Sequence, residues 1–119
     1  GQFVRCIAES LALKYRNAIE NLESVIGKKI NSINMVGGGI QDKLLCEFTA
    51  KGTQRKVVTG PVEATAMGNL LMQAYALGEI KSLEELREVV RKSTELTEYM
   101  PDNHEEWDNA YKRFLEIIK

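Results

Sequence analysis

Three consecutive glycines, at positions 37 to 39, constrain the fold of this chain more than any other feature of its sequence. The segment before them, 30–36, has Ile33 and Met35 spaced as on one face of a strand, and 41–51 has the apolar spacing of a helix. Glycine adopts positive φ readily and lets a ligand approach the backbone, while a helix start presents free N–H groups to anions. The pattern predicts a strand, a tight turn and a helix. A nucleotide site at the turn and a turn without a ligand both fit it.

Two common nucleotide-binding motifs do not fit this turn. A P-loop requires Gly-Lys-Ser/Thr, which does not follow the glycines. The dinucleotide fingerprint requires a third glycine at the position that Asp42 occupies. Any nucleotide site here therefore belongs to a different class.

The remaining sequence predicts more helices and one more short strand. Apolar residues recur three and four positions apart along a first helix at 2–26, which Gly27 ends. The helix at 41–51 is expected to end at Gly52, and Val57 and Val58 predict a strand. Further helices are expected at 62–77, with Pro61 leading into the first turn, at 83–93 behind a capping box, and after a turn at 101–103. The side chains expected to face the core are Val4, Ile7, Leu11, Tyr15, Ala18, Leu22, Val25, Leu44, Leu45, Phe48, Trp107, Tyr111, Phe114 and Ile118.

The helix predicted at 62–77 is nearly free of charge, with Glu63 as the exception. We expect such a helix to be buried on more than one side. Its small residues favour close packing as the explanation. The alternative is a functional one, in which Glu63 or Thr65 faces a cleft at the strand ends, where open α/β sheets bind ligands.

The order of elements predicts an α/β layer with two neighbouring parallel strands. Two strands rarely form a stable sheet alone. We therefore expect more strands from a second copy, or from a part of the protein absent here. The start at Gly1, without a Met and directly ahead of a helix, favours a fragment of a longer protein.

Composition narrows the possible functions. Of the 119 residues 44% are hydrophobic and 28% are charged, as in ordinary globular proteins, and the net charge of −1 gives no nucleic-acid footprint. The apolar stretches are shorter than the roughly 20 residues that cross a bilayer. Cys6 and Cys46 form no CxxC pair, which indicates a reducing cytoplasm. The acids around His104 are read as a surface helix start rather than a metal site.

Several segments in this order resemble the FGGY family of carbohydrate kinases, which share the actin/hexokinase-like (ribonuclease H-like) fold. That family has a strand–Gly-Gly-Gly–helix adenosine motif, a valine-rich strand, and a helix with a Glu-Ala-x-Ala-x-Gly pattern. The corresponding segments here are 35–42, 57–58 and 63–69. Segments 5–12, 44–50 and 60–65, and Tyr99-x-Pro101, are most similar to the branch that acts on L-rhamnulose, so the resemblance covers residues 3 to about 101.

The resemblance implies that residues 1–119 are a C-terminal fragment of the kinase's C-terminal domain, with an adenosine-site α/β portion at 1–79 and C-terminal helices at 80–119. It implies ATP-dependent phosphorylation, with Mg²⁺, of the 1-hydroxyl of L-rhamnulose in the cytoplasm. The sugar site and the catalytic aspartate are expected in the missing N-terminal part. The implied cofactor-binding residues are Gly37, Gly38, Gly39, Gln41 and Asp42. Asp42 replaces the family's usual Asn and adds a negative charge beside the nucleotide.

No catalytic or metal-binding residue is predicted in this chain. Aspartate-x-glycine loops hold Mg²⁺ and phosphates in such kinases, and none of the three aspartates here has glycine two positions on. One alternative is the same family acting on another ketose or polyol. Another is a non-catalytic module that binds partners through its apolar helices. Self-association of the fragment is expected, because it would cover surface that the missing part normally buries.

Overall fold

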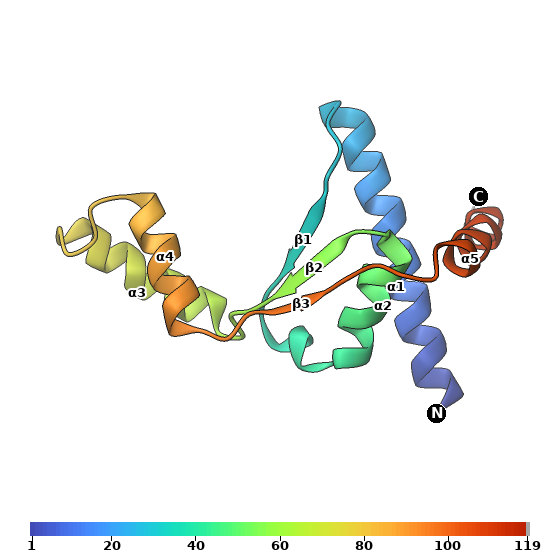
Figure 1. Cartoon of the computed structure of the whole chain (residues 1–119), viewed down its shortest axis with the longest axis horizontal. Helices are drawn as coiled ribbons and strands as arrows, with labels where there is room; N and C mark the ends of the chain where they lie inside the picture. Colours follow the sequence, from blue (N-terminus) through green and yellow to red (C-terminus); the bar gives the residue numbers. More distant parts are fainter. Residues whose placement is uncertain (119) are drawn as a thin grey trace.

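The computed structural model describes residues 1–118 and shows helices packed around a small sheet, with a helical arm projecting from one side (Figure 1). The molecule is elongated, with extents of 53 × 37 × 22 Å. Its elements in chain order are α1 (Gln2–Ile26), β1 (Ser32–Met35), the 3₁₀ turn η1 (Gly38–Gln41), α2 (Lys43–Thr53), β2 (Lys56–Thr59), α3 (Ala64–Ala76), α4 (Leu83–Ser93), β3 (Thr97–Tyr99) and α5 (His104–Ile117).

The described residues form one mixed sheet with the strand order β1–β2–β3. β1 and β2 are parallel, with Ile33 opposite Val57, which confirms the predicted parallel pair. β3 was not expected from the sequence, and it runs antiparallel to β2 with Tyr99 opposite Val57. The expectation that this chain supplies only two strands is therefore wrong. The segment after α4 returns along β2 and adds a third.

The core lies where α1, α2 and α5 meet. A Cβ built on Gly52 of α2 would lie 3.0 Å from the Cβ of Ala12 in α1, so small residues let these two helices cross closely. Trp107 of α5 closes the crossing, and its ring centroid lies 5.4 Å from that of Phe48. The buried residues of this cluster are Ala8, Ala12, Leu13, Phe48, Trp107 and Tyr111.

The bounds of α2 differ from the prediction. Gly52 does not end the helix, because its missing side chain makes room for α1 and α5. α2 continues to Thr53, and Gln54 ends it with a left-handed φ of 55°. Phe48 is buried as expected, whereas Leu44 is exposed.

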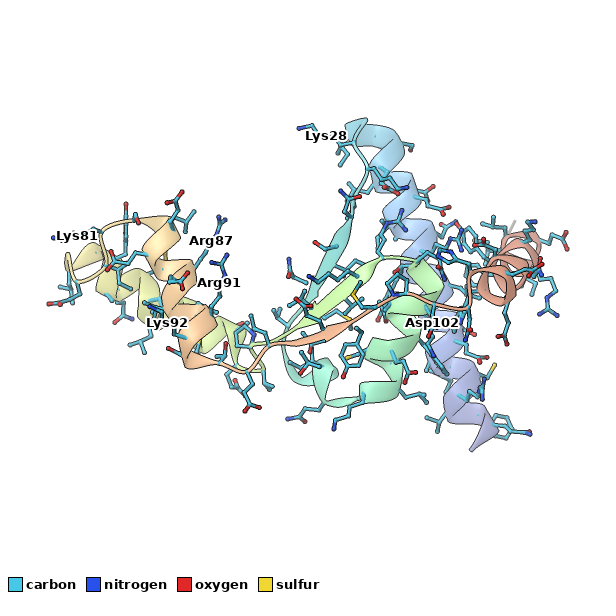
Figure 2. The ribbon with its side chains drawn as sticks, in the orientation of Figure 1. Lys28, Lys81, Arg87, Arg91, Lys92 and Asp102 are labelled. Carbon is cyan, nitrogen blue, oxygen red and sulfur yellow. The ribbon has the colours of Figure 1, made fainter. Side chains whose placement is uncertain are left out.

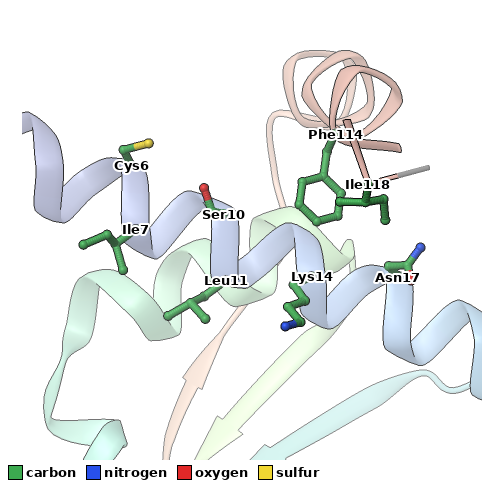
Figure 3. Close-up of a pocket in the computed structure, with 8 residues that line it drawn as sticks. All are labelled: Cys6, Ile7, Ser10, Leu11, Lys14, Asn17, Phe114 and Ile118. Atoms are coloured by element: carbon green, nitrogen blue, oxygen red, sulfur yellow. The ribbon is translucent and has the colours of Figure 1, made fainter. Parts of the chain in front are cut away.

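The predicted apolar stripe of α1 is not its buried face. Val4, Ile7, Leu22 and Val25 are all at least half exposed, because the close crossing with α2 uses the smaller residues beside them. A groove of about 580 Å³ follows part of this uncovered stripe, between α1 and the end of α5 (Figure 3). The groove is lined by Cys6, Ile7, Ser10, Leu11, Lys14, Asn17, Phe114 and Ile118.

α3 and α4 pack against each other and stand apart from α1, α2 and α5 as an arm (Figure 1). The prediction that α3 is buried on more than one side is wrong within this chain. Of residues 64–76, all of which the structure describes, only Leu71 is buried. α3 also begins at Ala64, so Pro61 lies ahead of its first turn. The cap of α4 is as predicted, since the N–H of Glu85 donates to Ser82 Oγ at 3.0 Å.

Two arginines join α1 to its neighbours. Arg16 Nη1 donates to Asp108 Oδ1 of α5 at 2.7 Å, and its guanidinium lies 4.2 Å from the centroid of the Tyr111 ring. Arg55, which is buried, pairs with Glu23 near the end of α1. These contacts fix the position of α1 relative to both α5 and the start of β2.

Candidate functional site

The three glycines lie where β1 leaves the sheet. Gly37 has a φ of 86°, a conformation that glycine adopts without the strain a side chain would add. Its N–H donates to the carbonyl of Pro61 at 3.1 Å, and the N–H of Gly60 donates to the carbonyl of Met35 at 2.9 Å. The glycine turn is therefore held beside the turn that follows β2, at the carboxyl ends of both parallel strands.

Gly38 and Gly39 are exposed in the η1 turn. A Cβ built on either would meet no atom of the described residues within 4 Å. Packing inside the described chain therefore does not require glycine at these positions. This open backbone suits the close approach of a ligand, which is the interpretation that the sequence left open.

Asp42 is the N-cap of α2, with its Oδ1 accepting from the N–H of Leu45 at 3.1 Å. The helix thus starts two residues later than predicted, and η1 lies between the glycines and α2. Asn serves equally well as an N-cap. Asp42, in place of the family's usual Asn, therefore keeps the cap of α2 and adds a negative charge. The Asp42 carboxylate is engaged in holding the helix start.

A hollow of about 470 Å³ lies beside the glycine turn. Its walls come from η1, the start of α2, the end of β2, and the segment from the end of α4 into β3. Of the predicted site residues, Gln41 lines the hollow. The three glycines come directly before Ile40, the first lining residue, and are not part of the lining themselves. The lining residues are Ile40, Gln41, Lys43, Thr59, Pro61, Val62, Thr94, Glu95, Thr97 and Tyr99.

Charges of both signs lie at this edge. Lys43, the first residue of α2, and Glu95 both line the hollow, and the Asp42 carboxylate caps the start of the helix. Lys43 is the cation available to an anionic ligand there, while Asp42 offsets the positive end of the helix dipole. Behind the hollow, Cys46 is buried, and its Sγ lies 3.6 Å from the carbonyl of Ile40. Burial raises the pKa of this thiol, and Asp42 raises it further, so Cys46 stays a neutral packing residue.

The sequence pattern did not predict β3 or the wall that it forms in the hollow. The signal was weak, because the strand is three residues long, although Thr and Tyr both favour strands. Gly60 is what lets it form. With a φ of 118°, Gly60 would place a Cβ 2.9 Å from the Glu95 carbonyl oxygen, so only glycine lets the chain entering β3 pass this close.

The other candidates from the sequence lie outside the hollow. Glu63 and Thr65 are exposed at the start of α3, in the arm. His104 is exposed at the start of α5. Within residues 1–118, no three His, Cys, Asp or Glu side chains are grouped so that they could hold a metal ion. In the same part of the chain, no helix has the length and apolar character to span a membrane.

Comparison with known proteins identifies the class. Residues 1–77 match the family model for the C-terminal domain of the FGGY family of carbohydrate kinases. The chain therefore belongs to the FGGY family of carbohydrate kinases, as its glycine motif and the order of its segments predict. The crystal structure of xylulose kinase from Rhodospirillum rubrum matches 92% of this chain with a TM-score of 0.68 at 20% identity, over 22% of that protein. This likeness confirms the fold as part of an actin/hexokinase-like kinase domain.

Three curated relatives of this chain are rhamnulokinases. Rhamnulokinase from Bacteroides thetaiotaomicron is 41% identical over all 119 residues, which correspond to 24% of its own length. Rhamnulokinase from Halalkalibacterium halodurans is 39% identical over 105 residues, covering 88% of this chain and 22% of the relative. Rhamnulokinase from Bacillus subtilis is 41% identical over 101 residues, covering 85% of this chain and 21% of the relative. The chain thus spans about a quarter of the length of the curated relatives it matches.

Proposed function

We propose that this chain is the nucleotide-side portion of an ATP-dependent sugar kinase that phosphorylates L-rhamnulose at its 1-hydroxyl in the cytoplasm. The observation that carries the proposal is the 41% identity to a rhamnulokinase along the whole chain. The glycine turn at the carboxyl ends of two parallel strands supports it, because open α/β sheets bind ligands at that edge.

In this proposal the backbone of Gly37, Gly38 and Gly39 lies against the adenosine and inner phosphates of ATP. The residues fit that role, since a Cβ built on Gly38 or Gly39 would meet no atom of the described residues within 4 Å, which leaves this backbone open to a ligand. Gln41 supplies hydrogen bonds to the nucleoside. Asp42 acts indirectly by capping α2 and holding the turn in place. Lys43 attracts the phosphates to this edge.

ATP supplies the phosphoryl group that is transferred, and Mg²⁺ is expected to arrive with its phosphates. The described residues offer no cluster that fits a metal, so we assign no Mg²⁺ ligand among residues 1–118. What this portion contributes is the placement of ATP. The residues that orient the sugar and accept its proton are assigned to the rest of the kinase.

The test is ADP release by the intact gene product with ATP and Mg²⁺ across a panel of ketoses and polyols that includes L-rhamnulose. Selective turnover of L-rhamnulose is the expected result. Turnover of a different sugar would keep the kinase and change its substrate, which is the first alternative. Absence of turnover on every sugar would remove the kinase proposal.

A second candidate, a helical interaction module, is favoured by the apolar surface that the arm exposes. Leu70, Met72 and Leu77 are all more than half exposed. In water such a surface favours association, so self-association of the chain is expected under this alternative. Sedimentation velocity distinguishes the two: a tight dimer that ignores nucleotide, together with an inactive gene product, supports the module.

A further inference from the structure

We propose that β3 forms the base-binding wall of the nucleotide site, with Tyr99 stacking on the adenine and Thr97 hydrogen-bonding to the nucleoside. The inference rests on the proposed kinase function and extends it to residues beyond 1–77, the part that matches the family model. Thr97 and Tyr99 both line the hollow of about 470 Å³ beside the glycine turn.

The position of the hollow is set by the direction of the strands. β1 and β2 run parallel and end at the glycine turn and at Gly60, while β3 runs the opposite way and begins there. A ligand seated against the glycine turn therefore meets Thr97 at the start of β3, and Tyr99, two residues further along the strand, lines the same hollow. Typical ligand pockets measure about 300–1,000 Å³, and the volume of this hollow falls within that range.

Strand geometry selects which β3 side chains line the hollow. Successive side chains of a strand point to opposite faces, so Thr97 and Tyr99 share one face. Glu98, between them, lies on the other face and forms an ion pair with Lys56 of β2 at 2.9 Å. Tyr99 thus lines the hollow while its neighbour Glu98 does not. A substitution of Glu98 is therefore a matched control for a substitution of Tyr99.

The chemistry of the walls fits a nucleoside. Ile40, Pro61 and Val62 supply aliphatic surface, and Tyr99 supplies an aromatic ring for a flat base. Side chains that can hydrogen-bond to base edges and sugar hydroxyls alternate with them, and Lys43 adds a cation toward the phosphates. The uncharged polar lining residues are Gln41, Thr59, Thr94 and Thr97, and Glu95 adds a carboxylate that can accept hydrogen bonds from sugar hydroxyls.

The β3 wall is held in place by two local contacts. Thr59 Oγ1 donates to the carbonyl of Thr97 at 3.3 Å, which ties the start of β3 to the end of β2. Gly60 admits Glu95 and Leu96 at a distance that a Cβ would forbid. The wall is therefore preorganised, so binding of a base does not carry the entropy cost of ordering it.

The experiment uses the intact gene product and compares Tyr99→Ala with Glu98→Ala. Stacking on an aromatic ring contributes about 1–3 kcal/mol per base, so Tyr99→Ala is expected to raise the KM for ATP by roughly fivefold or more. The KM for the sugar should stay unchanged. Glu98→Ala should leave both KM values unchanged. Tyr99→Phe, which keeps the ring, should stay within about twofold of the wild type.

Direct binding separates this inference from the proposed function. Titration calorimetry with ADP measures the affinity of the wild type and of Tyr99→Ala even if no sugar is turned over, so the kinase proposal can fail while the site is still tested. Equal ADP affinity or equal ATP KM for Tyr99→Ala and Glu98→Ala would overturn the inference, as would an ADP affinity too weak to detect in the wild type.

A second variant covers the case in which Tyr99→Ala fails to fold, which thermal melting reveals. Thr97→Val keeps the shape and strand propensity of the side chain and removes its hydroxyl. It is expected to raise the KM for ATP several-fold with an unchanged melting temperature. An unchanged KM for ATP in a folded Thr97→Val protein removes Thr97 from the site. If Tyr99→Ala does not fold, the same result overturns the inference.

Discussion

Burial does not follow apolar content when the helical body (α1, α2 and α5) is compared with the α3–α4 arm. The body is built from α1, α2 and α5, each of which carries charged residues, and it contains the buried cluster around Trp107. The arm contains α3, the helix freest of charge, and buries little besides Leu71 within residues 64–76. Figure 2 shows arm side chains such as Lys81, Arg87 and Lys92 far from Lys28 and Asp102 of the body.

Apolar content therefore does not decide what a helix buries within its own chain. α1 and α2 bury their small faces because Ala12 and Gly52 let them cross closely. α3 has small residues too, but among the described residues its main neighbouring helix is α4. The exposed apolar side chains of α3 therefore indicate a contact that the described residues do not provide.

The largest effect should separate the two regions most clearly. Trp107→Ala removes a side chain that is 7% exposed at the centre of the body, and such truncations cost about 3–5 kcal/mol. Leu77→Ala, at an arm position that is 80% exposed, should change the free energy of unfolding by less than about 0.5 kcal/mol. Urea unfolding of this chain measures both. Equal losses for the two variants would contradict the division into body and arm.

The same substitution at two helical glycines should have opposite signs. Gly52→Ala places a Cβ 3.0 Å from Ala12 and 3.2 Å from the Trp107 ring, so it should destabilise the body by about 1–3 kcal/mol. Gly68→Ala in α3 meets nothing among the described residues within 4 Å and should raise helix stability by about 0.5–1 kcal/mol. Thermal melting of both variants is the measurement, and two shifts of one sign would refute the comparison.

Helix caps offer a smaller and more local test. Asp42→Ala removes the cap of α2 in the body, and Ser82→Ala removes the cap of α4 in the arm. Each cap contributes about 0.5–2 kcal/mol. Native-state hydrogen exchange should show faster exchange confined to α4 for Ser82→Ala, but faster exchange across α1, α2 and α5 for Asp42→Ala. Exchange that spreads through the body in Ser82→Ala would mean that arm and body unfold together.

The smallest expected effect is a pH dependence confined to the body. Burial raises the pKa of the Tyr111 phenol above its ordinary value near 10, and Glu20, which accepts from it at 2.6 Å, raises it further despite the opposing charge of Arg16. The unfolded chain therefore loses this proton first, so the contribution is full below about pH 10 and is lost as pH rises through the folded pKa. Melting at about pH 8 and pH 11 should show a smaller alkaline loss in Tyr111→Phe than in the wild type. Identical losses would rule out Tyr111 as the group responsible.

The local structure follows closely from the amino-acid sequence. Gly27 and Ser82 mark helix boundaries that the structure reproduces, because caps are set by one residue and its nearest backbone. The glycine turn also follows from local pattern, and the parallel pair of strands follows from the order of the elements. The family follows from the order of these segments, and its match to residues 1–77 confirms it.

Which helix faces are covered, and which residues surround the glycine turn, depends on tertiary contacts. The role of Gly52 inside α2 depends on Ala12, forty positions earlier, and the approach that Gly60 permits depends on Glu95, thirty-five positions later. β3 and its wall of the hollow exist because β2 offers an edge to a three-residue segment too short to carry a pattern of its own. Periodicity reports which side chains share a face of an element. It does not report which neighbour the fold brings to that face, because that depends on contacts between residues distant in sequence.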